Sequence, residues 1–177
     1  PETKLIKSQK VPYVEMKDLP EHGMWVSPSI YRVYKGSGSK FKDHDTLLAR
    51  ITPCLENGKT GYVSSLEDQV GWGSTEFLVF RPKKEYWREW IYLLARSNHF
   101  RSYAIGSMVG SSGRQRVPAE NMKKYSVIIP DNTTIEKFHQ VTEAIFKKIK
   151  NVSLENQKLA ALRDLLLQKL MKGEIKV

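Results

Sequence analysis

The sequence predicts an α+β chain, in which a globular domain of mixed α/β structure over residues 1–132 precedes a long coiled-coil helix and tail over residues 133–177. The first observation is the distribution of residues that break regular structure. Every glycine except Gly173 lies before residue 114, and all eight prolines lie at or before Pro130. Residues 134–172 therefore contain no helix breaker, whereas the first part consists of short apolar runs separated by turns.

The second observation is a set of short runs rich in β-branched or aromatic residues. Four of them are expected to be strands: Thr46–Ile51, Gly61–Ser64, Glu76–Phe80 and Tyr125–Ile129. A proline follows three of these runs and ends the strand, because proline cannot donate a hydrogen bond to a sheet.

One segment of the first part has helical spacing instead. Residues Glu85–Ser97 place Trp87, Trp90 and Leu94 on one side. We expect Trp87, Trp90 and Tyr92 to form the core side of this helix. Phe100–Ala104 either continues it or starts a second short helix.

The third observation is the apolar row of the C-terminal helix, which should start at Thr133 or Thr134 and stop at Lys172-Gly173. About 39 residues at 1.5 Å each give roughly 58 Å. Apolar residues recur along the helix at alternating steps of three and four residues, with three polar interruptions, as in a coiled coil. The expected interface consists of Ile135, Phe138, Ile145, Ile149, Val152, Asn156, Leu159, Leu166 and Leu170. Such a helix requires a partner helix from its own domain, another domain or another chain. Asn156 either fixes the register of this pairing or lies solvated at its edge.

The charge balance favours nucleic acid as a partner. Lys and Arg number 29 against 19 Asp and Glu, so the net charge is +10 and the isoelectric point is near 9.6. Such an excess indicates an acidic partner, with nucleic acid first and an anionic membrane second. No apolar run approaches the roughly 20 residues that cross a bilayer, and we expect no membrane contact.

Metal and redox chemistry find little support. The single Cys54 cannot form an intrachain disulfide, which agrees with a reducing, cytoplasmic setting. Asp43, His44 and Asp45 are consecutive, and three neighbouring residues rarely present ligands to one metal. We expect no metal site, no cofactor and a packed thiol at Cys54.

Residues Gly110–Val117, with the sequence GSSGRQRV, form the segment best suited to contact a nucleic acid. Two glycines let the backbone approach a ligand closely. Serine can donate to phosphate, arginine can pair with phosphate or guanine, and glutamine can bind adenine through two hydrogen bonds. The side chains concerned are Ser111, Ser112, Arg114, Gln115 and Arg116. The alternative is a polar surface loop whose glycines only make turns.

Two further basic loops offer donors for phosphates or bases. One carries Arg50, Asn57 and Lys59, and the other carries Lys35, Lys40 and Lys42. In the first loop, Glu56 could instead pair with Arg50 or Lys59 in a purely structural role. In the second loop, the alternative is a solvated charged surface.

The segment Gly71–Glu76 precedes a strand. Trp72 lies between glycines, and we favour packing over stacking on a base. Thr75 and Glu76 are expected to hold the loop through hydrogen bonds.

Four segments together resemble one known family. The tail Leu159–Ile175 (LAALRDLLLQKLMKGEI) resembles the end of type I restriction-modification specificity subunits. Leu48–Lys59 (LARITPCLENGK), Gly73–Phe77 (GSTEF) and Gly110–Pro118 (GSSGRQRVP) resemble the recognition domain of the same family, in the same order.

The resemblance implies a non-catalytic subunit with two target recognition domains, each followed by a long helix, that reads a split double-stranded DNA target. Methyltransferase subunits dock on it, and restriction (translocase) subunits join that complex. This sequence has one such domain and one helix. We expect either a half-subunit that dimerises through the helix or the second half of a longer chain.

Two other classes of function compete with DNA recognition. A methyltransferase needs a glycine-rich cofactor loop and an Asn/Asp-Pro-Pro-aromatic motif, and the sequence has neither. The remaining alternative is a coiled-coil scaffold whose basic head binds protein. Salt-dependent DNA binding would separate the two, because phosphate contacts weaken steeply with salt.

Overall fold

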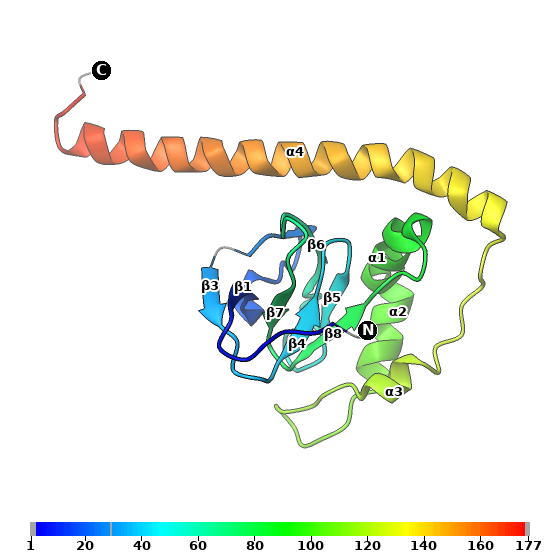
Figure 1. The fold of residues 1–177 in the computed structure, drawn as a ribbon. Helices are drawn as coiled ribbons and strands as arrows, with labels where there is room; N and C mark the ends of the chain where they lie inside the picture. The colour runs from blue at the N-terminus through cyan, green and yellow to red at the C-terminus, as the bar shows by residue number, and fades with distance from the viewer. Residues whose placement is uncertain (1–2, 29, 176–177) are drawn as a thin grey trace. The chain divides into compact units, whose positions relative to one another are not determined.

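The computed structural model describes residues 3–28 and 30–175, and the chain divides into two compact units, Pro1–His139 and Gln140–Val177. The first unit contains two small sheets and several short helices, and the second is the rest of one long helix with its tail (Figure 1). The predicted α+β class with a long C-terminal helix is therefore confirmed.

Each of the two sheets has four strands. The first has the order β3-β1-β7-β4 and consists of β1 (Lys10–Val14), β3 (Ile30–Val33), β4 (Ser39–Phe41) and β7 (Gly71–Gly73). The second has the order β2-β6-β5-β8 and consists of β2 (Trp25–Val26), β5 (Thr46–Ala49), β6 (Thr60–Val63) and β8 (Phe77–Phe80). Both sheets mix parallel and antiparallel pairs.

Strand β5 is buried on both faces, because its side chains alternate between two cores. Leu47 and Ala49 belong to a cluster that also contains Val14 and Phe41 of the first sheet. Leu48 points the other way, into a cluster with Phe100. The strand thus fixes the second sheet between the first sheet and the helices.

The helices of the first unit follow β8. A 3-10 turn (Glu85–Trp87) leads into α1 (Arg88–Arg96), which is followed by α2 (Asn98–Gly106) and the short α3 (Ala119–Met122). A second 3-10 turn, Met16–Asp18, follows β1. The Ser97 side chain accepts a hydrogen bond from the Phe100 amide and caps α2. Phe100–Ala104 therefore belongs to a separate second helix.

Three of the four expected strands are present, with boundaries that shift by one or two residues. The fourth expectation is wrong, because Tyr125–Ile129 is not a strand. Its apolar side chains are exposed, Ile128 by 92% and Ile129 by 70%. β-branched and aromatic residues favour strands because they pack well on a half-buried sheet surface. This segment pairs with neither sheet, so its composition does not produce a strand.

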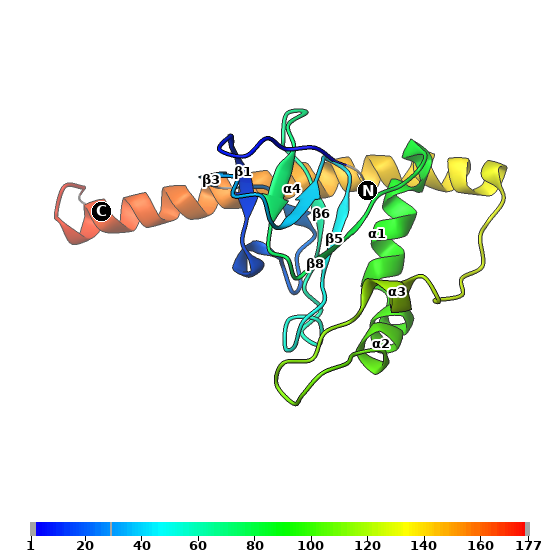
Figure 2. The same ribbon diagram turned by 60° about the horizontal axis from the view of Figure 1, so that its bottom comes forward.

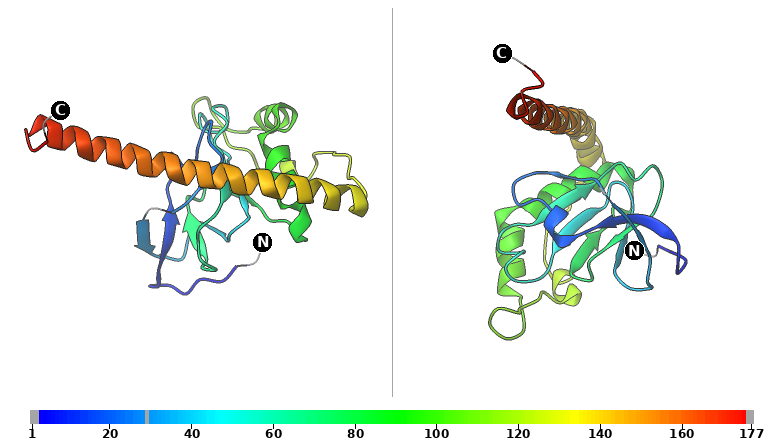
Figure 3. Two further views of the ribbon diagram at one scale, coloured as in Figure 1. Left: turned by 90° about the horizontal axis from the view of Figure 1, so that it is seen from above. Right: turned by 90° about the vertical axis from the view of Figure 1, so that its left-hand side faces the viewer.

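The long helix α4 runs without interruption over Asn132–Met171 (Figure 3). Asp131 caps its start, since its Oδ1 accepts from the Thr134 amide at 2.9 Å and its Oδ2 from the Thr134 hydroxyl at 2.7 Å. At the other end, Gly173 has φ +69°, and the Glu174 amide donates to the Lys169 carbonyl at 3.0 Å. This is a Schellman ending, as the glycine predicted.

Candidate nucleic-acid interface

The glycine-flanked segment forms a hairpin, Met108–Val117, which we call the recognition hairpin. The backbones of Val109 and Arg116 exchange two hydrogen bonds of 2.9 Å. The Arg114 amide donates to the Ser111 carbonyl at 3.0 Å and closes the turn. Gly113 has φ +79°, which suits the third position of a type II turn and favours glycine.

The recognition hairpin lies against the end of β5. The Val117 amide donates to the Arg50 carbonyl at 2.8 Å, and the Thr52 amide donates to the Gln115 carbonyl at 3.1 Å. The hairpin and the β5–β6 loop therefore emerge at the same end of the unit (Figure 2). Two loops that are far apart in the sequence therefore form one surface.

One carboxylate joins these two loops. Oε2 of Glu76 accepts from Nε of Arg50 at 3.1 Å, and Oε1 of Glu76 accepts from Nε of Arg116 at 2.9 Å. Glu76 is itself held by a hydrogen bond from its amide to the Ser74 hydroxyl. The expectation that Glu76 holds its loop through hydrogen bonds is confirmed. The acidic partner of Arg50 is Glu76, whereas Glu56 contacts Thr52.

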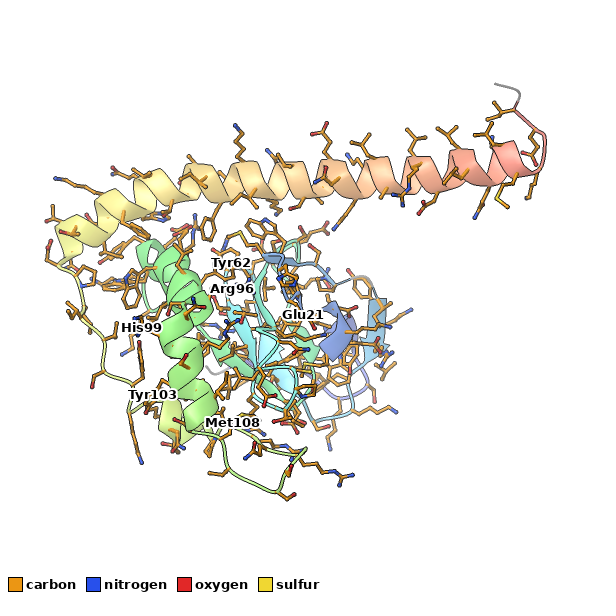
Figure 4. The ribbon with its side chains drawn as sticks, turned by 180° about the vertical axis from the view of Figure 1, so that it is seen from behind. Glu21, Tyr62, Arg96, His99, Tyr103 and Met108 are labelled. Atoms are coloured by element: carbon orange, nitrogen blue, oxygen red, sulfur yellow. The ribbon has the colours of Figure 1, made fainter. Side chains whose placement is uncertain are left out.

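The far end of the β5–β6 loop is held by α1. Arg96 donates to the carbonyls of Glu21 and Gly58, each at 3.0 Å. Asn57 donates to the Glu21 carboxylate at 3.3 Å. Lys59 donates to the Met16 carbonyl at 3.1 Å. Figure 4 shows Arg96 between α1 and the segment with Glu21. Asn57 and Lys59 therefore have structural partners, which leaves less of their donor capacity for DNA.

The remaining three candidate lysines lie on and near the other sheet. Lys40 is in β4, with its Nζ 5.5 Å from the centroid of the Tyr34 ring, while Lys35 and Lys42 are exposed. These lysines therefore come from the segment around β4, whereas Arg50 and Arg116 come from the end of β5 and the recognition hairpin.

Trp72 is packed, as expected. Its side chain is buried, and its ring lies 4.6 Å from that of Tyr13 and 5.2 Å from that of Tyr34, measured between centroids. Cys54 is half-buried against the core between the sheets.

The acidic and histidine side chains at 43–45 turn to different partners. Asp45 forms a two-point ion pair with Arg81, with distances of 2.8 and 2.6 Å. His44 contacts the Tyr62 hydroxyl at 3.0 Å, and Asp43 accepts from the Leu66 amide. Burial lowers the pKa of His44 below its ordinary value. Across residues 3–28 and 30–175, no group of three or more His, Cys, Asp or Glu side chains is arranged to hold a metal.

The expected helix interface is divided between the two units. Ile135 is only 1% exposed and belongs to the first unit, so its side chain is already covered within this chain and is not open to a second one. Phe138 is half-buried in the same unit. The other expected positions are exposed on α4: Ile145, Ile149, Val152, Asn156, Leu159, Leu166 and Leu170. Leu162, Leu165 and Leu167 extend this exposed apolar surface.

Two residues of the site had no clear signal in the sequence. Arg96 looked like an ordinary helix residue, and its role depends on carbonyl groups 38 and 75 residues away. Glu76 was expected to hold a loop, but its link to two arginines depends on tertiary structure. Tyr103 lies in α2 and Met108 begins the recognition hairpin just after that helix (Figure 4), and the Tyr103 hydroxyl donates to the Asn121 carbonyl of α3 at 2.9 Å.

The chain therefore combines a two-sheet unit that carries an arginine-bearing hairpin with a long C-terminal helix. Residues 1–164 match the family described as "Type I restriction modification DNA specificity domain". The chain belongs to this family.

Relatives and solved structures agree. The chain is 40% identical over 94 residues to the type I restriction enzyme EcoEI specificity subunit of Escherichia coli, which covers 52% of this chain and 16% of that protein. It is 30% identical over 94 residues to the type I restriction enzyme HindI specificity subunit of Haemophilus influenzae. This match covers 53% of this chain and 20% of that protein. Its fold resembles the HsdS subunit from Thermoanaerobacter tengcongensis, with a TM-score of 0.59 and 20% identity over 92% of this chain and 42% of that chain.

A second solved structure, from work on complex assembly and conformational transition of the type I R-M system, gives the same TM-score of 0.59 at 17% identity and covers 96% of this chain and 44% of that one. The chain thus spans less than half the length of the relatives it matches. In the part of the chain that the structure describes, no helix combines the length and apolar character needed to cross a membrane.

Proposed function

We propose that this chain is a DNA recognition module of a type I restriction-modification complex and reads one half of a bipartite target. Residues 1–132 act as the target recognition domain, and residues 133–177 act as the spacer helix and tail. The chain provides recognition, while methylation and cleavage belong to partner subunits.

One observation carries the proposal. The recognition hairpin places Arg116 beside Arg50 of the β5–β6 loop, with Arg114 exposed at the turn. Arginine donors on a glycine-turned hairpin suit phosphates and guanine edges. The family to which the chain belongs, and the net charge of +10, support DNA as the ligand.

On the recognition hairpin, the phosphate contacts are assigned to the exposed Ser111, Ser112 and Arg114, and in the segment around β4 to the exposed Lys35 and Lys42. Arg50, Gln115 and Arg116 are assigned to base edges. Lys40, Asn57 and Lys59 have a smaller part, because each already contacts a neighbour within the fold.

The helix supplies the second element of the proposal. An exposed row from Ile145 to Leu170 needs a partner, because leucine side chains gain free energy when a second helix covers them. We assign this row to a coiled coil with a second copy or with the other half of a longer chain. The same helix docks methyltransferase subunits, and restriction subunits join through them. A two-fold pair would read a palindromic split site.

The experiment is a salt titration of DNA binding. The full chain is titrated onto a random-sequence duplex by fluorescence anisotropy at several salt concentrations. The logarithm of the association constant should fall linearly with the logarithm of salt concentration, by about 0.9 per phosphate contacted. Binding without salt dependence, or no binding at low salt, would favour a protein-binding scaffold instead.

A further inference from the structure

Arg50 and Arg116 share the two oxygens of one carboxylate, and each uses the same atom to do so. Glu76 accepts from Nε of Arg50 at 3.1 Å and from Nε of Arg116 at 2.9 Å. Their side chains are 29% and 45% exposed, whereas that of Glu76 is 19% exposed. The carboxylate therefore lies beneath two guanidinium groups that reach the surface.

This arrangement leaves both terminal amino groups of Arg50, and Nη2 of Arg116, available. Among the described residues, no other side-chain contact engages Arg50, and Arg116 makes only one further, long bond of 3.4 Å to the Arg114 carbonyl. The two terminal amino groups of an arginine can donate together to O6 and N7 of guanine. Binding at Nε fixes the plane of each group without using that terminal pair.

The carboxylate also changes the local charge. Two guanidinium groups near one another repel, and one carboxylate between them reduces the cluster from two positive charges to one. A phosphate that approaches this cluster is attracted less strongly, while the hydrogen-bonding pattern presented to a base edge is unchanged. Arg114 forms no ion pair within residues 3–28 and 30–175, so it keeps its full attraction for phosphate.

We propose that Glu76 is a specificity-determining residue, which holds Arg50 and Arg116 by Nε so that their terminal amino groups read guanine in the major groove. The half-site of this chain therefore contains guanine at the positions that these arginines contact. The inference rests on the proposed DNA-recognition function. It adds that the base recognised is guanine and that Glu76 is the residue on which this preference depends.

The test compares Glu76→Gln with Glu56→Gln. Both variants remove one negative charge close to the same loop, but Glu56 contacts only Thr52, at 3.5 Å. Each full chain is incubated with a library of duplexes carrying a randomised site, and the bound DNA is sequenced. The wild-type chain and Glu56→Gln should enrich guanine, and Glu76→Gln should lose this preference by about tenfold per position. Its affinity for a random-sequence duplex should stay equal or rise, which a merely unfolded hairpin would not produce.

Several results would overturn the inference. One is a guanine preference that survives in Glu76→Gln, and another is an enriched wild-type site without guanine. If Glu76→Gln fails to fold in thermal unfolding, Glu76→Asp serves as the second variant. It keeps the charge but shortens the reach, and it should lose guanine preference while keeping the wild-type salt dependence. A wild-type chain that binds no duplex at all would reject the proposed function itself, which separates that failure from failure of the Glu76 assignment.

Discussion

Oε2 of Glu89 lies 2.7 Å from Nδ1 of His139, which joins α1 to the second turn of α4 inside the first unit. The other oxygen of Glu89 accepts from Nε of Arg88, also at 2.7 Å. The Glu89 side chain is only 2% exposed. A buried carboxylate is tolerated here because two cationic or polar partners replace its water.

Glu89→Gln should destabilise the first unit substantially. The substitution leaves the buried Arg88 guanidinium without its main counter-charge, and breaking a buried pair costs about 3 kcal/mol or more. Urea unfolding measures this loss. Glu85→Gln is the control, because Glu85 contacts the same arginine but is 74% exposed. Its cost should stay below about 1 kcal/mol, and equal costs for the two variants would contradict the network.

Arg114→Ala and Arg116→Ala should both weaken DNA binding, but in different ways. Loss of a phosphate contact at Arg114 should reduce the salt slope by about one unit and weaken all sequences alike. Loss of a base contact at Arg116 should cost about 1–3 kcal/mol only on the preferred site. Fluorescence anisotropy on the selected and random duplexes distinguishes the two. Lys83→Ala controls for net charge, and unchanged affinity in both arginine variants would remove the hairpin from the interface.

Leu159→Asp should abolish helix-mediated assembly while the first unit stays folded. The side chain is 55% exposed in the single chain, and a charge buried in a helix–helix seam carries a large desolvation cost. Light scattering of the 20.4 kDa chain gives the mass, and circular dichroism reports folding. Gln157→Asp adds the same charge on another face of α4 and should assemble normally. A Leu159→Asp variant that assembles like the wild type would contradict the seam.

The cap of α4 should weaken in acid. Hydrogen bonds from the Thr134 hydroxyl, and secondarily from the Thr134 amide, hold the pKa of the Asp131 carboxyl below its ordinary value. The folded state therefore binds the proton less readily than the unfolded state does. The stabilisation is complete above the unfolded pKa, near 4, and is lost as pH falls through the lower folded pKa.

Asp131→Asn provides the comparison for this cap. Asparagine also caps helices but does not titrate in this range. Thermal unfolding followed at 222 nm, from about pH 6 down to about pH 2, should show a difference between wild type and variant that shrinks in acid. A difference that is constant over this range would show that ionisation of Asp131 contributes nothing.

Sequence patterns predicted those elements whose signal is local. The uninterrupted run after Pro130 predicted α4, and Gly173 marked its end through the backbone conformation that only glycine adopts easily. Strands such as Thr46–Ala49 were found because a buried strand needs consecutive apolar residues. Strands β1, β2, β3, β4 and β7 were not predicted. Pro12 in β1 and the glycines that flank Trp72 in β7 are typical of turns, and β2 and β4 have only two and three residues.

The failure at Tyr125–Ile129 has a related cause. β-branched residues favour a strand only where a neighbouring strand and a core surface are present, and within residues 3–28 and 30–175 no strand pairs with this segment. Ile135 shows the same limit in a helix, since periodicity predicts a face but not what covers it. The seam pattern is continuous through Ile135, yet the side chain is buried within the first unit.

By itself, the sequence determined the order of the two parts, the extent of the long helix and the glycine-containing segment that carries Arg114 and Arg116, because these depend on residues close together in the chain. Only the tertiary structure decided that Arg50, Glu76 and Arg116 meet. Three segments must be brought together by β5, β8 and the recognition hairpin before one carboxylate can reach both guanidinium groups. An ion pair between residues far apart in the chain produces no periodic pattern in the sequence. It forms only once the two cores on either side of β5 are packed.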